Sequence, residues 1–211
     1  MATGYASATE LTFDGTAFDN TGGTQLIPQA YGDRVTSTTV GAFEYGPEGG
    51  FTPNVEVSYS TSGGNELEYA ESFFGTLVGV AFNPDPNGEF FEINFQADPG
   101  FEVALSSLNI AKFGGPNTLT DIIVTDGDDT ELLRFGSVSF ATGSNERNFF
   151  LDANFDPALQ APELTVRVVT SLESIQWGVD NITFSQVVIP EPSSALLLAV
   201  GGLVLRRCRR A

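Results

Sequence analysis

Short runs in which apolar and polar residues alternate make up most of this 211-residue chain, and glycine or proline separates them. Val55, Val57 and Tyr59 occupy alternate positions of one run, and Phe91 and Ile93 do so in another. Successive side chains of a β-strand point to opposite faces of the sheet, so this alternation predicts strands with one buried face. The same pattern recurs at residues 103–105, 122–124, 132–135, 164–168 and 182–184.

Turn residues between these runs indicate how the strands connect. We find no sustained helical period before residue 190, and the pair Asp126 and Gly127 is a hairpin signal between two runs. Short strands with one apolar face pack as two sheets, so we expect an all-β, two-sheet antiparallel β-sandwich of the jelly-roll type, followed by one C-terminal hydrophobic helix. We expect loops, turns or connections at residues 20–32, 41–51, 83–88 and 156–162.

Composition excludes several classes of function. The chain carries 27 acidic and 9 basic residues, a formal net charge of -18, and such a surface repels phosphate, so nucleic acid is not an expected partner. It contains no histidine, which excludes Ser-His-Asp catalysis and His-ligated zinc. Its single cysteine, Cys208, cannot form an intramolecular disulfide. The 18 phenylalanines and 41% hydrophobic residues indicate a packed core rather than disorder.

The C-terminal residues 190–211 form a segment of three parts. Pro190, Glu191 and Pro192 begin it, and proline ends a preceding strand because it has no N–H to donate. An uncharged apolar run follows at residues 195–205. Basic residues close the segment: Arg206, Arg207, Arg209 and Arg210.

This order of parts resembles the PEP-CTERM sorting signal of bacterial exported proteins. The resemblance implies an exosortase-type membrane protease as partner, which processes the chain near Glu191. It also implies export through an inner-membrane intermediate to the cell surface or the extracellular space, with the arginines held on the cytoplasmic side. Residues 193–205 span only about 20 Å as a helix, less than the roughly 30 Å of a hydrocarbon core, so snorkelling and local thinning must accommodate them. A short buried core helix with a basic tag is the alternative interpretation.

The N-terminus lacks the basic and apolar regions of an export signal. Ala6, Ser7 and Ala8 have the small-x-small form of a signal-peptidase site, so we interpret residues 1–8 as the remnant of a signal peptide whose start lies upstream; chance small residues are the alternative. The expected organisation is then this remnant, a β-sandwich domain at residues 9–187 and a sorting tail with a transmembrane helix at 188–211.

Asp180 is the first candidate metal ligand. It shares parity with Ile182 and Phe184, which predicts that it leans toward the core. A carboxylate there is costly unless it is paired or bound to a metal, and Ca²⁺, which prefers hard oxygen ligands, suits it. The alternative is an Asp at a strand start that is hydrogen-bonded to turn N–H groups.

Residues 11–14 and 178–182 resemble parts of exported jelly-roll domains related to carbohydrate-binding modules. The resemblance implies a structural calcium where the first and last strands meet. Asp14 and Asp180 are then the candidate ligands, with Asp33 as a third. The acidic run at residues 126–129 lacks the spacing of an EF-hand loop, and we interpret it as a solvated hairpin turn.

Glu66, Glu68 and Glu71 resemble the Glu-x-Asp-x-x-Glu signature of retaining β-glucanases on sandwich folds, although Glu68 stands where the signature has Asp. A glycan-active hydrolase that uses Glu66 and Glu71 is therefore the alternative function. The polar face of a half-buried strand explains the same residues. Trp177 is a candidate for stacking on a sugar ring, but its parity with Val179 favours the core. Our leading expectation is a non-catalytic, exported protein of the cell envelope or extracellular matrix that binds polysaccharide, with calcium.

Overall fold

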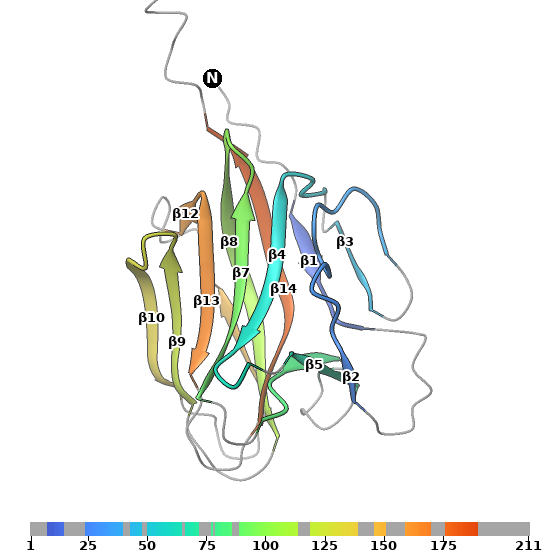
Figure 1. The fold of residues 1–211 in the computed structure, drawn as a ribbon, viewed down its shortest axis with the longest axis vertical. Helices are drawn as coiled ribbons and strands as arrows, with labels where there is room; N and C mark the ends of the chain where they lie inside the picture. The colour runs from blue at the N-terminus through green and yellow to red at the C-terminus, as the bar shows by residue number, and fades with distance from the viewer. Residues whose placement is uncertain are drawn as a thin grey trace, which may run out of the picture.

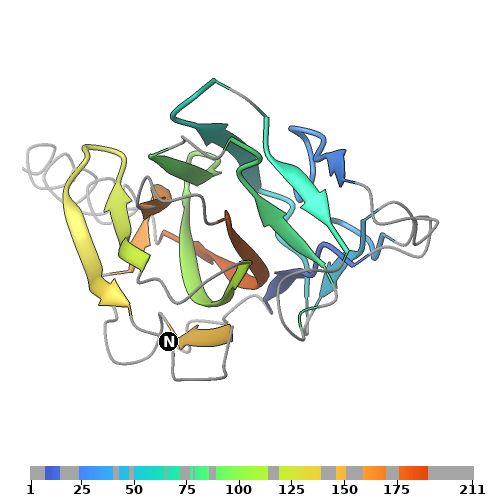
Figure 2. The same cartoon turned by 90° about the horizontal axis from the view of Figure 1, so that it is seen from below.

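The computed structural model describes residues 8–14, 24–39, 43–47, 50–64, 66–71, 77, 79–85, 89–113, 119–138, 146–150, 159–169 and 176–189. These residues form two antiparallel β-sheets that pack face to face, which confirms the predicted all-β sandwich (Figures 1 and 2). In this part of the chain no helix is long and apolar enough to span a membrane. The expected C-terminal helix, the motif Pro190, Glu191 and Pro192, and the arginine cluster lie outside the described residues.

One sheet has five strands, in the order β10 (Glu131–Val138), β9 (Leu119–Asp126), β13 (Glu163–Val169), β7 (Phe90–Ala97) and β4 (Val55–Thr61). Every second side chain of β4 is buried along its first six residues, and β7 and β13 show the same alternation, as the sequence predicts. The buried face packs on the other sheet, and the opposite face carries mostly polar side chains.

The other sheet has nine strands. Its main path runs β11 (Glu146–Phe150), β8 (Phe101–Phe113), β14 (Gln176–Val188), β6 (Val80–Phe82), β5 (Glu68–Ala70) and β2 (Thr24–Leu26). Off this path lie β1 (Thr9–Leu11), which pairs with β14 and β3 (Tyr45–Pro47), and β12 (Gln160–Ala161), which pairs with β8. The expectation of loops at residues 20–32, 41–51 and 156–162 is wrong in part, because β2, β3 and β12 lie there. Strands of two or three residues are too short for an alternation to be visible in the sequence.

The core lies between the sheets and draws buried side chains from both. Phe95 of β7 and Phe184 of β14 pack with ring centroids 4.9 Å apart. Trp177 is 1% exposed and belongs to the same cluster. The prediction that Trp177 packs in the core is therefore confirmed, and its buried ring is not available to stack on a sugar.

The hairpin between β9 and β10 turns at residues 126–130. Asp126 Oδ1 accepts hydrogen bonds from the backbone N–H of Asp128 and of Thr130 at 3.0 and 2.9 Å, and Asp129 has a left-handed φ of 59°. Residues 127–130 are exposed. A carboxylate that accepts its own turn's N–H groups is a structural turn residue, so the interpretation as a solvated hairpin is confirmed.

Candidate functional site

The last strand, β14, changes partner partway along one of its edges. Gly178 and Val179 pair with β6, whereas residues 182–184 pair with β1. The other edge of β14 pairs with β8 along most of its length. Asp180 and Asn181 therefore lie where the partner changes from β6 to β1, at a place that we call the strand junction.

A β-bulge positions Asp180 at the strand junction. The register between β14 and β8 shifts between Asp180 and Thr183, and Asn181 has a left-handed φ of 50°. Val179 and Ile182 both belong to the core cluster, so two residues separate inward-facing positions where a regular strand has one. The predicted burial of Asp180 is confirmed, at 2% exposure. The parity argument behind that prediction is wrong, because the bulge breaks the alternation with Ile182.

Asp14 approaches the junction from the end of β1. Phe13, with a φ of 49°, turns the chain out of the strand. Its carbonyl oxygen lies 2.6 Å from the place that a Cβ would take on Gly79, the residue before β6, and only glycine allows so close an approach. Asp14 comes close enough to Asp180 for its charge to act on that carboxyl group. The structure thus places the two residues that the sequence suggests as metal ligands within range of each other's charge.

Burial disfavours a negative charge on both carboxyl groups. Loss of solvent raises the pKa of Asp180 to about 9; the N–H of Asn181 opposes this rise, and the charges of Asp14 and Glu10 add to it. Burial, followed by the charge of Glu44, also raises the pKa of Asp14. Asp180 therefore holds a proton at neutral pH unless a cation compensates its charge.

The oxygen atoms at the junction suit a hard cation. Asp180 accepts hydrogen bonds from the backbone N and the side-chain Nδ2 of Asn181 at 2.7 and 3.0 Å. Asp14 Oδ1 is buried and accepts no hydrogen bond from the residues that the structure describes. Those residues contain no group of three His, Cys, Asp or Glu side chains that could hold a metal. Backbone carbonyls and water would therefore have to complete the roughly six to eight oxygen ligands of Ca²⁺ around Asp14 and Asp180.

Asp33, the expected third ligand, takes part in a different contact. Its Oδ1 accepts a hydrogen bond from the backbone N–H of Val57 at 2.5 Å, at the edge of β4. The carboxylate of Asp33 thus forms a hydrogen bond with the edge of β4. Within the described ranges, no group of three His, Cys, Asp or Glu side chains is placed to hold a metal.

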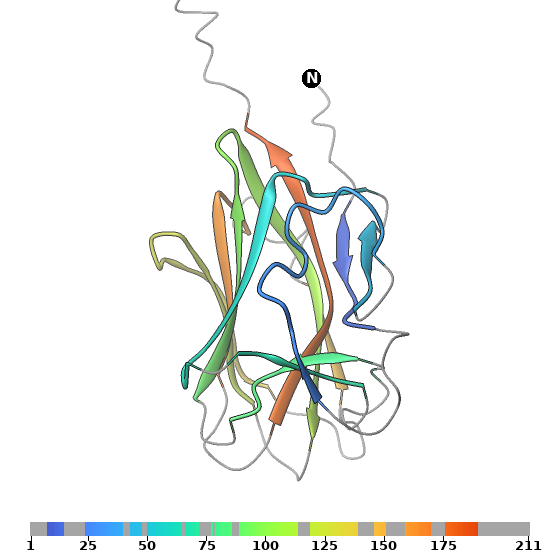
Figure 3. The ribbon, with the colours of Figure 1, turned by 45° about the vertical axis from the view of Figure 1, so that its right-hand side comes forward.

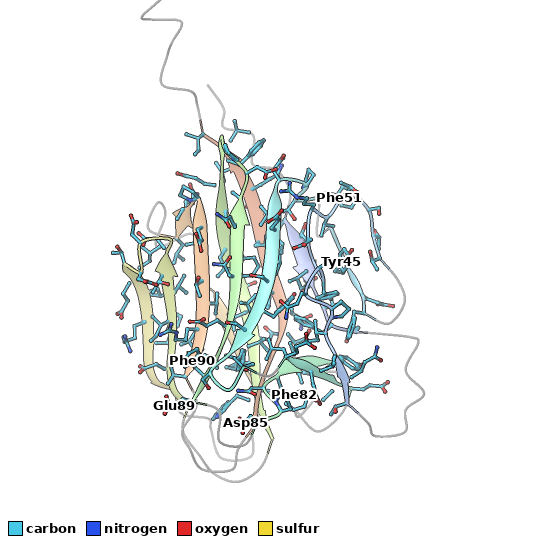
Figure 4. All side chains as sticks on the ribbon, viewed as in Figure 1. Tyr45, Phe51, Phe82, Asp85, Glu89 and Phe90 are labelled. Carbon is cyan, nitrogen blue, oxygen red and sulfur yellow. The ribbon has the colours of Figure 1, made fainter. Side chains whose placement is uncertain are left out.

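An open cleft of about 240 Å³ lies beside the strand junction. Glu10 and Glu44 line it, and they are the carboxylates whose charges act on Asp180 and Asp14. Tyr45, on the β3 side of the molecule in Figure 4, also contributes. Hydroxyl groups, carboxylates and an aromatic ring are the groups that bind the hydroxyls and apolar faces of a sugar. The complete lining is Glu10, Thr12, Thr38, Thr39, Glu44, Tyr45 and Gly46.

Hydrogen bonds to one carbonyl group fix the wall of this cleft. The carbonyl oxygen of Glu44 accepts a hydrogen bond from Thr12 Oγ1 at 2.6 Å and another from the hydroxyl of Tyr31 at 2.5 Å. Tyr31 is buried, and its ring packs edge-on against Tyr45 with centroids 5.1 Å apart. The position of β3 relative to β1, and hence of Glu44 relative to Glu10, is therefore set by side chains as well as by the strand pairing.

Sequence reasoning missed Glu10, Glu44 and Tyr31 as parts of the site. Glu10 alternates with the buried residues Thr9 and Leu11, which is a signal in the sequence itself. Glu44 and Tyr31 lie in segments expected to be loops, where no periodicity marks them. Their role depends on tertiary contacts that a local pattern does not contain.

The residues of the alternative hydrolase do not share one strand. Glu66 is exposed and precedes β5, Glu68 begins the strand, and Glu71 follows it. Leu67, Tyr69 and Ala70 are the buried residues between them. Glu66 is thus a solvated side chain outside the strand, whereas the hypothesis needs paired carboxylates on one strand face.

No model of a known protein family and no curated protein matches the sequence. Among solved structures, a Stig cyclase, Fisc, from Fischerella sp. TAU superposes with a TM-score of 0.41 and 14% identity over 87% of this chain and 100% of that chain. A CBM4 module gives 0.37 and 12%, over 64% and 88%. The enzymatically active domain of bacteriophage CBA120 tailspike protein 4 gives 0.34 and 12%, over 64% of this chain, which spans only 19% of that one.

Other structural neighbours include a xylan-binding domain of CBM22 and TmCBM61 in complex with a galactotriose. Several neighbours of this fold are thus carbohydrate-binding modules. At such low scores and identities, the likeness says nothing about what this chain itself binds.

Proposed function

We propose that this chain is an exported, non-catalytic protein of the cell envelope or extracellular matrix, and that it binds polysaccharide in the cleft beside the strand junction. The observation that carries the proposal is the pair formed by the buried carboxyl group of Asp180 and the partly buried Asp14, whose charge acts on it. Glu10, which also acts on Asp180, lines a cleft of hydroxyls and carboxylates. Sugar hydroxyls donate hydrogen bonds to Glu10 and Glu44 and accept them from threonine hydroxyls such as that of Thr38.

In this proposal Asp14 and Asp180 hold a structural Ca²⁺ ion. The ion supplies the positive charge that the buried carboxylate of Asp180 and the partly buried carboxylate of Asp14 need. The orphaned Oδ1 of Asp14 supports it. By tying the end of β1 to β14, the ion also holds Glu10 and Thr12 in place along the cleft.

The acidic surface favours some polysaccharides over others. A chain with a net charge of -18 repels polyanions at ordinary ionic strength. Glu10 and Glu44 add two carboxylates within the cleft itself. We therefore expect neutral polysaccharides to bind more tightly than uronic acid polymers.

Export and sorting belong to the same proposal, with an exosortase-type protease and the membrane as partners of residues 190–211. The last strand, β14, ends at Val188, two residues before Pro190, as expected for a strand that a proline terminates. Cell fractionation tests this part. Full-length product that stays intact in the cytosolic supernatant would contradict export.

Binding is tested by titrating the full chain, in calcium, with a panel of neutral and acidic polysaccharides, using affinity electrophoresis and calorimetry. We expect at least one neutral polymer to bind, and the variant Glu10→Gln/Glu44→Gln to lose about tenfold or more in affinity, which corresponds to about 1.4 kcal/mol. Glu89→Gln is the matched control, because Glu89 is an exposed carboxylate near the lower end of the molecule in Figure 4. An equal loss in this control, or no binding to any polymer, would refute the cleft as the site.

The same panel tests the absence of catalysis. We expect no release of reducing sugar from any polymer. Release that disappears in both Glu66→Gln and Glu71→Gln would establish the glycan hydrolase instead.

A further inference from the structure

The strand β4 forms one edge of the five-stranded sheet, and β7 is its partner within that sheet. On the side away from β7, alternate residues of β4 present backbone groups, as Val57 and Tyr59 do with their N–H groups. The unpaired backbone groups of such an edge can form hydrogen bonds with a strand of another chain. Whether the edge is covered therefore affects whether the protein associates in solution.

Residues 29–34, which we call the edge strap, cover this edge. In Figure 3 the blue segment that precedes β3 runs beside the cyan β4. Side-chain oxygens of the strap stand where the carbonyls of a neighbouring strand would accept hydrogen bonds. Three hydrogen bonds join the strap to backbone atoms of β4: Arg34 N to Val55 O at 2.8 Å, Val57 N to Asp33 Oδ1 at 2.5 Å, and Tyr59 N to Gln29 Oε1 at 3.1 Å.

The strap is held at two levels. Tyr31 of the strap and Val35, the residue after it, are buried, at 5% and 2% exposure, and anchor the strap in the core. On the surface, Arg34 forms a bidentate pair with Asp98 at 2.6 and 2.8 Å and a further bond to Glu56 at 2.7 Å. The acceptors Gln29 and Asp33 can therefore be removed by mutation while the buried anchors stay in place.

The sequence of β4 is compatible with pairing to a second copy of itself. If the whole strand Val55–Thr61 pairs antiparallel with its copy, the two-fold axis passes through Ser58. Val57 then exchanges hydrogen bonds with Tyr59 of the copy. Glu56 faces Ser60 of the copy, so no like charges stand directly opposite each other. In this register odd-numbered residues pair with odd-numbered residues and even with even. The buried side chains of both copies therefore lie on the same face of the joined sheet.

We propose that the edge strap is an autoinhibitory contact that keeps β4 from pairing with β4 of a second copy of this chain. Opening the strap joins two five-stranded sheets into one continuous sheet across a two-fold axis. This inference concerns self-association and does not depend on the proposed binding of polysaccharide.

The test uses the full chain carrying Gln29→Ala/Asp33→Ala/Arg34→Ala. Hydrogen exchange should accelerate about tenfold or more at the amides of Val57 and Tyr59 in dilute samples, because these amides lose their acceptors. Sedimentation should then show a fraction of dimer that increases with protein concentration. Should the triple variant lose its folded circular dichroism signal, the double variant Gln29→Ala/Asp33→Ala carries the same expectations.

The matched control is Gln96→Ala/Asp128→Ala/Arg134→Ala. It removes the same residue types from the same sheet, and Arg134, like Arg34, pairs with two carboxylates. We expect its association and its exchange at Val57 and Tyr59 to equal those of the unaltered chain. Equal association of the two triple variants would overturn the proposal, as would faster exchange in the strap variant without any dimer.

A crosslink tests the register. In a Cys208→Ser background, Ser58→Cys places one thiol on the two-fold axis, where paired Cα atoms lie about 4.5–5.5 Å apart and a disulfide fits. Oxidation should give a covalent dimer in the strap variant and little in the chain with an intact strap. Equal yields in the two backgrounds would also overturn the proposal.

Discussion

The backbone N–H of Phe13 donates a hydrogen bond to the hydroxyl of Tyr31, 3.1 Å away, and both residues are buried. The same hydroxyl donates to the carbonyl of Glu44. One phenol thus joins the end of β1, the wall of the cleft and the edge strap.

Replacing Tyr31 by Phe should therefore destabilise the fold. The buried N–H of Phe13 loses its acceptor, and an unsatisfied buried donor costs about 1–3 kcal/mol. Denaturant unfolding of the two proteins measures the difference. Tyr45→Phe is the control, because Tyr45 is only partly buried, and a loss in the control as large as in Tyr31→Phe would contradict this account.

The stability of the fold should depend on pH through Asp180. Without calcium the contribution of this residue should fall as the pH rises, and the stabilisation by calcium should increase over the same range. The folded-state pKa of Asp180, about 9, lies above the ordinary value of 3.8 for an Asp side chain, so the folded chain holds the proton more tightly than the unfolded chain. In chelator, this contribution is fully present at pH values below 3.8 and is lost as the pH rises toward about 9. In the proposed site calcium would bind the deprotonated form, so the rise in Tm that it produces should grow over the same window.

Melting curves from about pH 5 to about pH 9, in calcium and in chelator, measure both effects. Asp180→Asn should flatten the pH dependence in chelator and abolish the shift with calcium. If saturating calcium leaves the Tm of the unaltered chain unchanged at every pH, the metal assignment of Asp14 and Asp180 fails.

Gly79→Ala should damage the strand junction. The new Cβ would lie 2.6 Å from the carbonyl oxygen of Phe13, which belongs to the backbone and cannot rotate away. Such overpacking costs about 1–3 kcal/mol, and the displacement of Phe13 should also weaken the calcium-dependent rise in Tm through Asp14. Gly136→Ala is the control, since its Cβ would meet only the carboxylate end of Asp121 at 3.3 Å. Equal losses of stability in the two variants would argue against a special role for Gly79.

Trp177 makes the core visible to fluorescence, since the chain has a single tryptophan. Because the ring is 1% exposed, native emission should be blue-shifted and resist quenching by acrylamide, and both properties should vanish on unfolding. Saturating polysaccharide should leave the emission unchanged. Quenching by sugar in the folded state would show that Trp177 takes part in binding.

Much of the fold could be predicted from the sequence because the central strands β4, β7 and β13 alternate regularly over seven or eight residues. The short strands β2, β3 and β12 could not be predicted, because two or three residues are too few to show an alternation of apolar and polar side chains. The bulge at Asn181 is signalled only by an asparagine, a residue that tolerates the left-handed region better than most. The cleft depends on Glu44 and Tyr31, whose neighbours in space are distant in sequence.

The placement of β14 has a mechanical consequence for a domain held by its C-terminal end. This strand is bonded to β8 along one edge and to β1 and β6 along the other. Since antiparallel hydrogen bonds run perpendicular to the strands, tension along β14 loads many of them simultaneously, in shear, instead of peeling them apart in succession. If the domain is tethered at its C-terminal end, as we propose, the whole centre of the larger sheet resists flow or drag acting on it.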